Sequence, residues 1–202
     1  MDALDDTYKT IEKPSEGLFK DKGSKFIAYA YPVSEEESVK SIIQSLKKEH
    51  YNARHHCYAY RFGYRGQTFR VNDDGEPSGT AGRPIYGQIL SNNLTNILIV
   101  IVRYFGGTLL GVSGLINAYK SAASDVISNS TIITKVVKEK LSLEFDYVIQ
   151  NQIMKVVKDH QIDNENLSCG LLCTLDLYVR AGELDQVVGK LKKIEGLKIT
   201  SL

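Results

Sequence analysis

"DDGEPSGTAGRPI", residues 73–85, places three carboxylates, three glycines and two prolines within thirteen residues. A core strand or helix is not built from this composition, because glycine and proline both weaken regular structure. A simple exposed turn does not need such a density of charged and conformationally special residues either. The stretch therefore predicts a loop with a specific binding or structural role.

The charged residues of this loop allow two interpretations. Asp73, Asp74 and Glu76 could act as acid, base or magnesium ligands. They could equally cap the helix expected from about residue 81, because the first amides of a helix favour negative charge; capping is favoured for at least one of them. Thr80 and the glycines beside it could let the helix amino terminus receive an anion. Arg83 opposes the helix dipole, so it is expected to pair with a carboxylate or to face an anionic ligand.

Arginines gather around the loop. Six of the seven in the chain lie between residues 54 and 103, and arginine suits planar, bidentate recognition of anions. Upstream, "ARHHCYAYRFG" (53–63) reads as the start of a strand. Its His55 and His56 could be metal ligands with Cys57, but adjacent strand residues point to opposite faces. No second ligand pair at zinc spacing is present. We therefore expect one histidine to be buried, the other to be exposed beside the arginines, and no metal to bind.

Downstream, "VRYFGGTLLGVSGLINAY" (102–119) predicts a buried strand that ends in Arg103 and Tyr104, a break at Gly106 and Gly107, and a helix over about 113–128. A strand, a glycine-rich turn and a helix can together bind a phosphate. They can also simply form a tight turn with close helix–sheet packing, and both interpretations remain open. The GxGxxG pattern of dinucleotide-binding proteins is absent.

After about residue 138 the glycine-rich signals become sparse and a second domain is predicted. We place the boundary near residue 134, giving domains 1–134 and 135–202. The expected elements are strands at 141–145, 167–168, 171–179 and 197–202, with helices at 147–160 and 183–194. This β-α-β-β-α-β order is typical of a ferredoxin-like domain.

Composition excludes several classes of protein. The 202 residues are 43% hydrophobic with a net charge of +1, so one or two compact domains with real cores are expected and a general basic surface for nucleic acid is not. The longest apolar run, 97–102, is far too short to cross a membrane. No signal peptide is recognisable. Three cysteines without a CxxC motif predict a reduced protein in the cytoplasm.

Together the three stretches resemble the YigZ/IMPACT family. The resemblance rests on Ala53–Cys57, on Asp73–Pro77 with Gly79–Gly82, and on Val102–Gly107 with Leu110 and Gly111. It implies a first domain with the α+β fold of the second domain of a small-subunit ribosomal protein, also seen in translation-factor domain IV. It implies a second domain similar to domain V of elongation factor G. Eukaryotic relatives restrain the kinase that senses uncharged tRNA, and nucleic-acid or ribosome binding has been proposed for bacterial members.

The sequence thus predicts a two-domain α+β protein that binds RNA, the ribosome or a translation factor through an arginine- and glycine-rich groove. Arg54, Arg83 and Arg103 would contact phosphates or carboxylates, and Tyr104 would offer a stacking face. The alternative is an enzyme acting on a small anionic metabolite with Asp73, Asp74 or Glu76, although no convincing nucleophile is present. A third interpretation is that the motifs only stabilise an unusual loop. No cofactor is expected, and the chain would be a monomer or homodimer. The predicted site residues are Arg54, His55, His56, Asp73, Asp74, Glu76, Thr80, Arg83, Arg103, Tyr104, Gly106 and Gly107.

Overall fold

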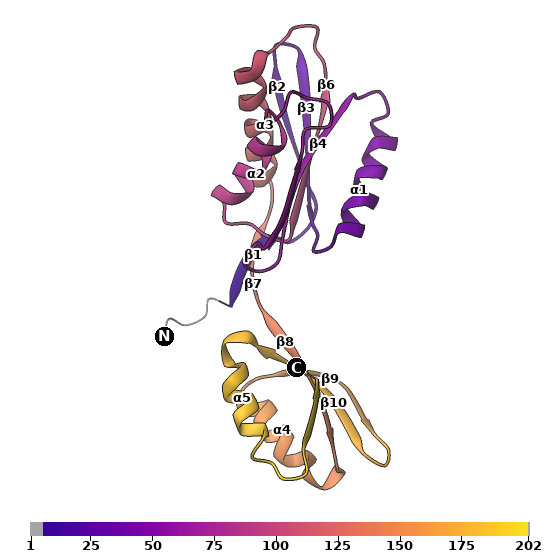
Figure 1. Ribbon diagram of the computed structural model, residues 1–202, viewed down its shortest axis with the longest axis vertical. Coiled ribbons are helices and arrows are strands. Elements are labelled where there is room, and N and C mark those ends of the chain that lie inside the picture. The colour runs from indigo at the N-terminus through magenta and orange to yellow at the C-terminus, as the bar shows by residue number, and fades with distance from the viewer. Residues whose placement is uncertain (1–5, 202) are drawn as a thin grey trace. The chain divides into compact units, whose positions relative to one another are not determined.

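The computed structural model describes residues 6–201 as two compact units (Figure 1). The first unit is Tyr8–Lys135. The second contains Asp6, Thr7 and residues 136–201. The sequence-based assignment placed residues 1–134 together, whereas Asp6 and Thr7 associate with the second unit. Residues 1–5 and 202 lie outside the described part of the chain.

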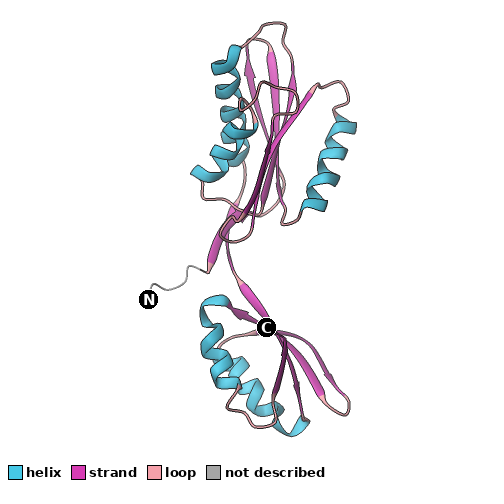
Figure 2. Ribbon diagram, viewed as in Figure 1, coloured by secondary structure: helices cyan, strands magenta, loops and turns pink. Residues whose placement is uncertain are grey.

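The first unit is built on a five-stranded antiparallel sheet with the order β2-β3-β6-β4-β5. Helix α1 packs on one face, and α2 and α3 pack on the other (Figures 1 and 2). The strands are β2 (Ser15–Asp21), β3 (Ser24–Pro32), β4 (His55–Phe62), β5 (Thr68–Asn72) and β6 (Ile97–Tyr104), and the helices are α1 (Glu36–Glu49), α2 (Gly82–Ser91) and α3 (Gly111–Ser128). A separate two-stranded sheet joins β1 (Thr7–Ile11) to β7 (Ile132–Val136).

The central strand β6 explains the apolar run of the sequence. Every side chain from Ile97 to Val102 is fully buried. Alternate residues point to opposite faces of a sheet, so Ile97, Ile99 and Ile101 enter the core under α2 and α3, while Leu98, Val100 and Val102 enter the core under α1. The run ends at Arg103, whose side chain lies on the α2 and α3 side of the sheet, over the ring of Phe26.

The second unit has the predicted β-α-β-β-α-β order, and its four-stranded antiparallel sheet runs β11-β8-β10-β9. Both helices pack against one core with the alternating apolar residues of β8 and β10. The strands are β8 (Lys138–Phe145), β9 (Asp163–Cys169), β10 (Cys173–Arg180) and β11 (Lys198–Ser201); α4 (Gln150–Asp159) and α5 (Leu184–Leu191) follow the 3₁₀ turns η1 (Tyr147–Ile149) and η2 (Ala181–Glu183).

The expectation that the protein is reduced is wrong for the two cysteines of the second unit. Cys169 and Cys173 form a disulfide, and only Cys57 is a free thiol among the described residues. The two half-cystines face each other across the β9–β10 hairpin, where they are direct partners in the strand register. A spacing of four residues around Gly170 brings them together, although it is not a CxxC motif.

Three strands at sheet edges differ from expectation for a common reason. The sequence indicated neither β2 nor β5, and β9 begins at Asp163 rather than at Leu167. These strands lie at sheet edges and expose much of their surface. Edge strands need no continuous apolar pattern, so their sequences carry a weak signal. Within residues 6–201, no helix is both long and apolar enough to span a bilayer.

Candidate functional site

The three motif stretches meet at one cavity of about 700 Å³ in the first unit. Its walls come from the start of β4, the loop between β5 and α2, the end of β6 and the first turn of α3. Five of the predicted site residues line it: Arg54, His55, Glu76, Arg103 and Tyr104. The other predicted residues lie outside the cavity lining, and several of them hold its loops.

Asp73 caps helix α2 from a distance in the sequence. Its Oδ1 accepts the N–H groups of Ala81 (3.0 Å) and Gly82 (2.8 Å), and its Oδ2 accepts that of Gly79 (2.8 Å). Burial alone would raise the pKa of Asp73, but these backbone donors lower it below its ordinary value. The expectation that one loop carboxylate caps the helix is therefore met by Asp73, and the residue at the N-cap position itself is Ala81.

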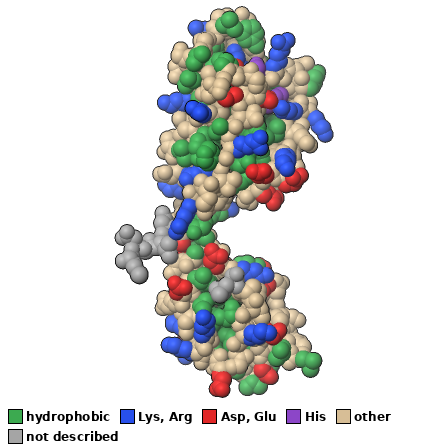
Figure 3. Space-filling model, in the orientation of Figure 1, with side chains coloured by type: hydrophobic (Ala, Val, Ile, Leu, Met, Phe, Trp, Pro, Cys, Tyr) green, Lys and Arg blue, Asp and Glu red, His purple; other side chains and the backbone are tan. Residues whose placement is uncertain are grey.

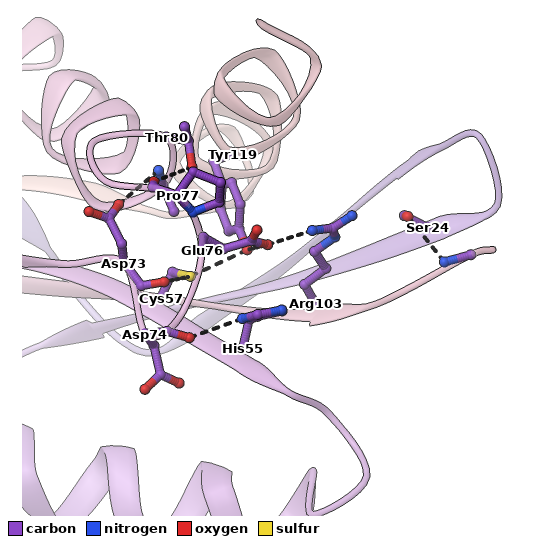
Figure 4. Close-up of polar contacts among 12 residues, drawn as sticks. Ser24, His55, Cys57, Asp73, Asp74, Glu76, Pro77, Thr80, Arg103 and Tyr119 are labelled. Atoms are coloured by element: carbon purple, nitrogen blue, oxygen red, sulfur yellow. Dashed lines mark hydrogen bonds and ion pairs between the residues drawn. The ribbon is translucent and has the colours of Figure 1, made fainter. Parts of the chain in front are cut away.

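The Asp74 carboxylate points to the α1 side, away from Glu76 (Figure 4). Its Oδ1 lies 3.2 Å from the Lys47 ammonium, and its Oδ2 accepts the backbone N–H of His56 at 2.7 Å. The Asp74 carbonyl oxygen lies 3.0 Å from His55 Nδ1. Since a carbonyl oxygen only accepts, His55 Nδ1 carries the proton and donates it, which fixes the ring orientation at the cavity wall.

Glu76 is buried in an ion pair at the back of the cavity (Figure 4). Its Oε1 accepts from Arg103 Nη1 at 2.6 Å and from the Tyr119 hydroxyl at 2.8 Å. The Cys57 thiol lies 3.3 Å from the Tyr119 hydroxyl and 3.0 Å from the Asp73 carbonyl oxygen. Burial raises the pKa of Cys57 and of Tyr119, so neither group is ionised near neutral pH.

Arg103 connects this buried network to the cavity. Its guanidinium carbon lies 5.5 Å from the ring centre of Phe26 and 5.7 Å from that of Phe105, a cation–π arrangement. The side chain is 7% exposed, and its Nε has no hydrogen-bond acceptor among the described residues. Arg103 is therefore held rigidly with only part of its donor capacity used.

The two adjacent histidines point to opposite faces of β4, as the strand period requires. His55 lines the cavity, whereas His56 is buried and its Nε2 has no partner among the described residues. Burial lowers the pKa of His56. In residues 6–201, no group of three or more His, Cys, Asp or Glu side chains is placed to hold a metal ion.

Two further predicted residues do not face the cavity as ligand contacts would. Thr80 is buried, and its hydroxyl donates to the Pro77 carbonyl oxygen at 2.7 Å, which closes the loop on itself. Arg83 is exposed, lies outside the cavity lining and forms no ion pair with another described residue. Its charge nevertheless contributes to the lowered pKa of Asp73, so the expectation that it interacts with a loop carboxylate is met without a direct ion pair.

Gly106 and Gly107, the glycine pair after β6, are required by the backbone conformation and not by a ligand contact. A Cβ at Gly106 would lie 1.8 Å from the Gly23 carbonyl carbon, so two loops approach each other too closely for any side chain. The Gly106 N–H also donates to Ser24 Oγ at 3.1 Å. Gly107 has a φ of +88°, which favours glycine. The pair thus supports the cavity wall without lining it.

Tyr104 borders the cavity but packs with the core beneath α1, and its hydroxyl lies 2.9 Å from His50 Nδ1. The ring available at the cavity is instead Phe105, which is 57% exposed. Sequence analysis also missed the apolar wall made by Leu109, Leu110, Val112 and Leu115. Leu109 is 83% exposed. A leucine between a glycine turn and a helix is the sequence signal from which this apolar wall could have been predicted.

The comparisons with known sequences and with solved structures agree with one another. The Impact N-terminal domain matches residues 22–127. "IMPACT family member YvyE" of Bacillus subtilis is 34% identical over 155 residues, which cover 77% of this chain and 71% of that protein. An "IMPACT family member" of Haemophilus influenzae is 33% identical over 164 residues, covering 80% and 79%. A solved structure described as that of a hypothetical protein aligns over 98% of both chains, with a TM-score of 0.74 and 27% identity.

Proposed function

Since the chain belongs to the IMPACT family, we propose that it is a translation-linked binding protein of the cytosol that recognises RNA, alone or within the ribosome. The cavity of the first unit is the recognition site in this proposal. It is a binding site and not a catalytic one.

The observation that carries the proposal is the way the three loop carboxylates are used. Asp73 is bound to the amides of α2, Asp74 to Lys47 and the His56 amide, and Glu76 to Arg103 and Tyr119. Unpaired carboxylates beside arginines would repel a phosphate backbone, but these three are neutralised or turned inward. The positive charge at the cavity mouth is therefore not opposed by a free loop carboxylate.

Arg54 supplies the accessible part of that charge. It is exposed at the cavity, and among residues 6–201 it has no ion-pair or side-chain hydrogen-bond partner. An arginine with an uncommitted guanidinium can bind a phosphate bidentately. Arg54 is thus the residue whose removal should weaken RNA binding without disturbing the fold.

The same contacts disfavour the enzyme alternative. General acid–base catalysis needs a carboxylate within hydrogen-bonding reach of the reacting atoms. Asp73 and Asp74 are engaged away from the cavity, and Glu76 is locked in an ion pair. The Cys57 thiol is buried and protonated. Among the described residues, the three loop carboxylates and the Cys57 thiol are thus all held in other contacts, which favours recognition over catalysis.

The expected affinity is modest. The net charge of the chain is +1, and basic side chains are scattered over the face seen in Figure 3 instead of forming one stripe. Long-range attraction to nucleic acid is therefore weak. Binding should depend on the local contacts at the cavity and should be sensitive to salt.

The test compares RNA and ribosome binding by the wild type, Arg54→Ala and Arg83→Ala at several salt concentrations. Arg83 is the matched control, because it is an exposed arginine outside the cavity. Loss of one phosphate contact should weaken binding about equally for all sequences and flatten the log–log salt dependence by about one. We expect this change in Arg54→Ala and none in Arg83→Ala. Absent binding by the wild type, salt-independent binding, or equal losses in both variants would contradict the proposal.

A further inference from the structure

The first turn of α3 forms one end of the cavity and has no partner for its positive end. Leu110, Gly111 and Val112 line the cavity. Among the side chains that the structure describes, none caps this helix, and no acidic residue occupies its first turn. The first N–H groups of a helix have no acceptor within the helix, and the helix dipole adds partial positive charge at this point. The start of α3 is therefore suited to an anion.

The backbone before this helix strengthens the same preference. Leu110 has right-handed helical angles (φ −85°, ψ −22°), and Gly111 follows with a φ of +72°. A right-handed residue followed by one of positive φ turns successive N–H groups towards a common point, which is the geometry of an anion-binding nest. A Cβ at Gly111 would meet no atom within 4 Å, so close packing does not explain the glycine at this position.

An independent feature of the cavity also points to an anion. Arg103 lines the cavity and is more than nine-tenths buried, with its Nη1 bound to Glu76 and its buried Nε without an acceptor among the described residues. Arg54 lines the same cavity and is exposed. Two guanidinium groups, of which Arg54 is the one not paired with a described residue, and an uncapped helix start thus border one cavity.

The remaining wall of the cavity is apolar and carries an open aromatic ring. Arg103 lies over the ring of Phe105, which is nevertheless 57% exposed. Leu109 and Val112 extend the apolar surface and are also exposed. An aromatic ring supported by a guanidinium provides a platform on which a base can stack.

We infer that the cavity holds one unstacked nucleotide, with its phosphate at the start of α3 beside Arg54 and its base against Phe105 and Leu109. This inference rests on the proposed function, because it states which part of an RNA the cavity takes. The volume of about 700 Å³ falls within the range of about 300–1,000 Å³ that is usual for small-molecule sites.

The experiment titrates the full chain with AMP, adenosine and inorganic phosphate by NMR or calorimetry. AMP should bind at least about tenfold more tightly than adenosine or phosphate, since only AMP uses both ends of the cavity. Phe105→Ala should weaken AMP binding and leave phosphate binding unchanged. If adenosine binds as tightly as AMP, or if AMP does not bind, the inference is overturned.

The sharpest variant is Ser113→Asp, which places a carboxylate in the first turn of α3 at an exposed position. The new charge satisfies the helix start, so the melting temperature should rise by about 1–3 °C. It also repels a phosphate, so AMP affinity should fall at least tenfold. The control Ser128→Asp adds the same charge at the other end of α3 and should leave AMP affinity within twofold. Unchanged AMP affinity in Ser113→Asp would overturn the inference.

The two proposals fail in different ways. RNA binding that is weakened by Arg54→Ala, together with no binding of AMP, would overturn the nucleotide inference alone. AMP binding that is sensitive to Ser113→Asp, without RNA or ribosome binding by the wild type, would overturn the RNA function and identify a mononucleotide site.

Discussion

Arg103 and Glu76 form a buried ion pair that joins the end of β6 to the acidic loop. The distance between Nη1 and Oε1 is 2.6 Å, and the two side chains are 7% and 3% exposed. The residues are 27 positions apart in the sequence, so the pair fixes the loop against the sheet and shapes the back of the cavity. In our account this pair is structural, and Arg54 and the start of α3 provide the accessible charge.

Removing one partner of this pair should be strongly destabilising. Glu76→Gln leaves Arg103 as an uncompensated buried charge, and Arg103→Met does the same to Glu76. Each single variant should lose about 3–5 kcal/mol of the free energy of unfolding. The double variant removes both charges and keeps an acceptor for Tyr119, so it should recover most of the loss. Urea unfolding of the four proteins measures this coupling. Additive losses in the double variant would show that the pair is not coupled.

Asp73→Ala should destabilise the loop and α2, because three amides lose their acceptor. The expected loss is about 1–2 kcal/mol, the range for a helix cap. The pKa of Asp73 is lowered in the fold, so its contribution is present above the ordinary aspartate pKa and disappears as pH falls through the folded value. Chemical unfolding at pH 7 and at pH 3 checks the sign. Asp159→Ala, at an exposed position, is the control and should change little.

The glycine pair after β6 offers a matched comparison. Gly107→Ala meets open space but must adopt a φ of +88°, which costs about 1–2 kcal/mol. Gly106→Ala places a methyl group 1.8 Å from the Gly23 backbone and should cost more than about 2 kcal/mol. Thermal melts of both variants test this order. Equal losses would mean that the two loops can separate without cost.

Asp6 should give the second unit a distinct pH dependence. Arg180 donates to both carboxylate oxygens, at 2.6 and 2.8 Å, and lowers the pKa of Asp6 to about 2. The stabilising effect is therefore complete above pH 4 and is lost as pH falls towards 2. Asp6→Asn should be less stable than the wild type at pH 7, and the difference should vanish near pH 2. A difference that stays constant from pH 7 to pH 2 would assign the effect to something other than the carboxylate charge.

The sequence predicted best those helices and strands whose buried apolar residues recur at regular intervals. The run from Ile97 to Val102 indicated a strand buried on both faces, and the apolar stripes of α3 and α4 indicated helices. The β-α-β-β-α-β order of the second unit followed from the same signal. Edge strands such as β5 have no such period, because their residues are exposed or only half-buried along the whole strand.

The candidate site was predictable by composition but not by orientation. Arginine crowding indicated the right region, and Arg54, His55 and Arg103 do line one cavity. The sequence could not show that Asp74 turns its carboxylate to α1, because that depends on a φ of +38° at this residue and on Lys47, 27 positions away. Nor could it show that Phe105 rather than Tyr104 keeps its ring exposed, since the register of β6 decides which face each residue takes.

The central claim, that this cavity binds RNA, is tested most directly by mapping amide NMR shifts of the full chain during titration with a short single-stranded RNA. The account predicts saturable shifts centred on Phe105, Gly111 and Val112, with smaller shifts near Arg54, and loss of these shifts in Arg54→Ala. No shifts at the start of α3, or shifts confined to residues outside the cavity, would contradict it.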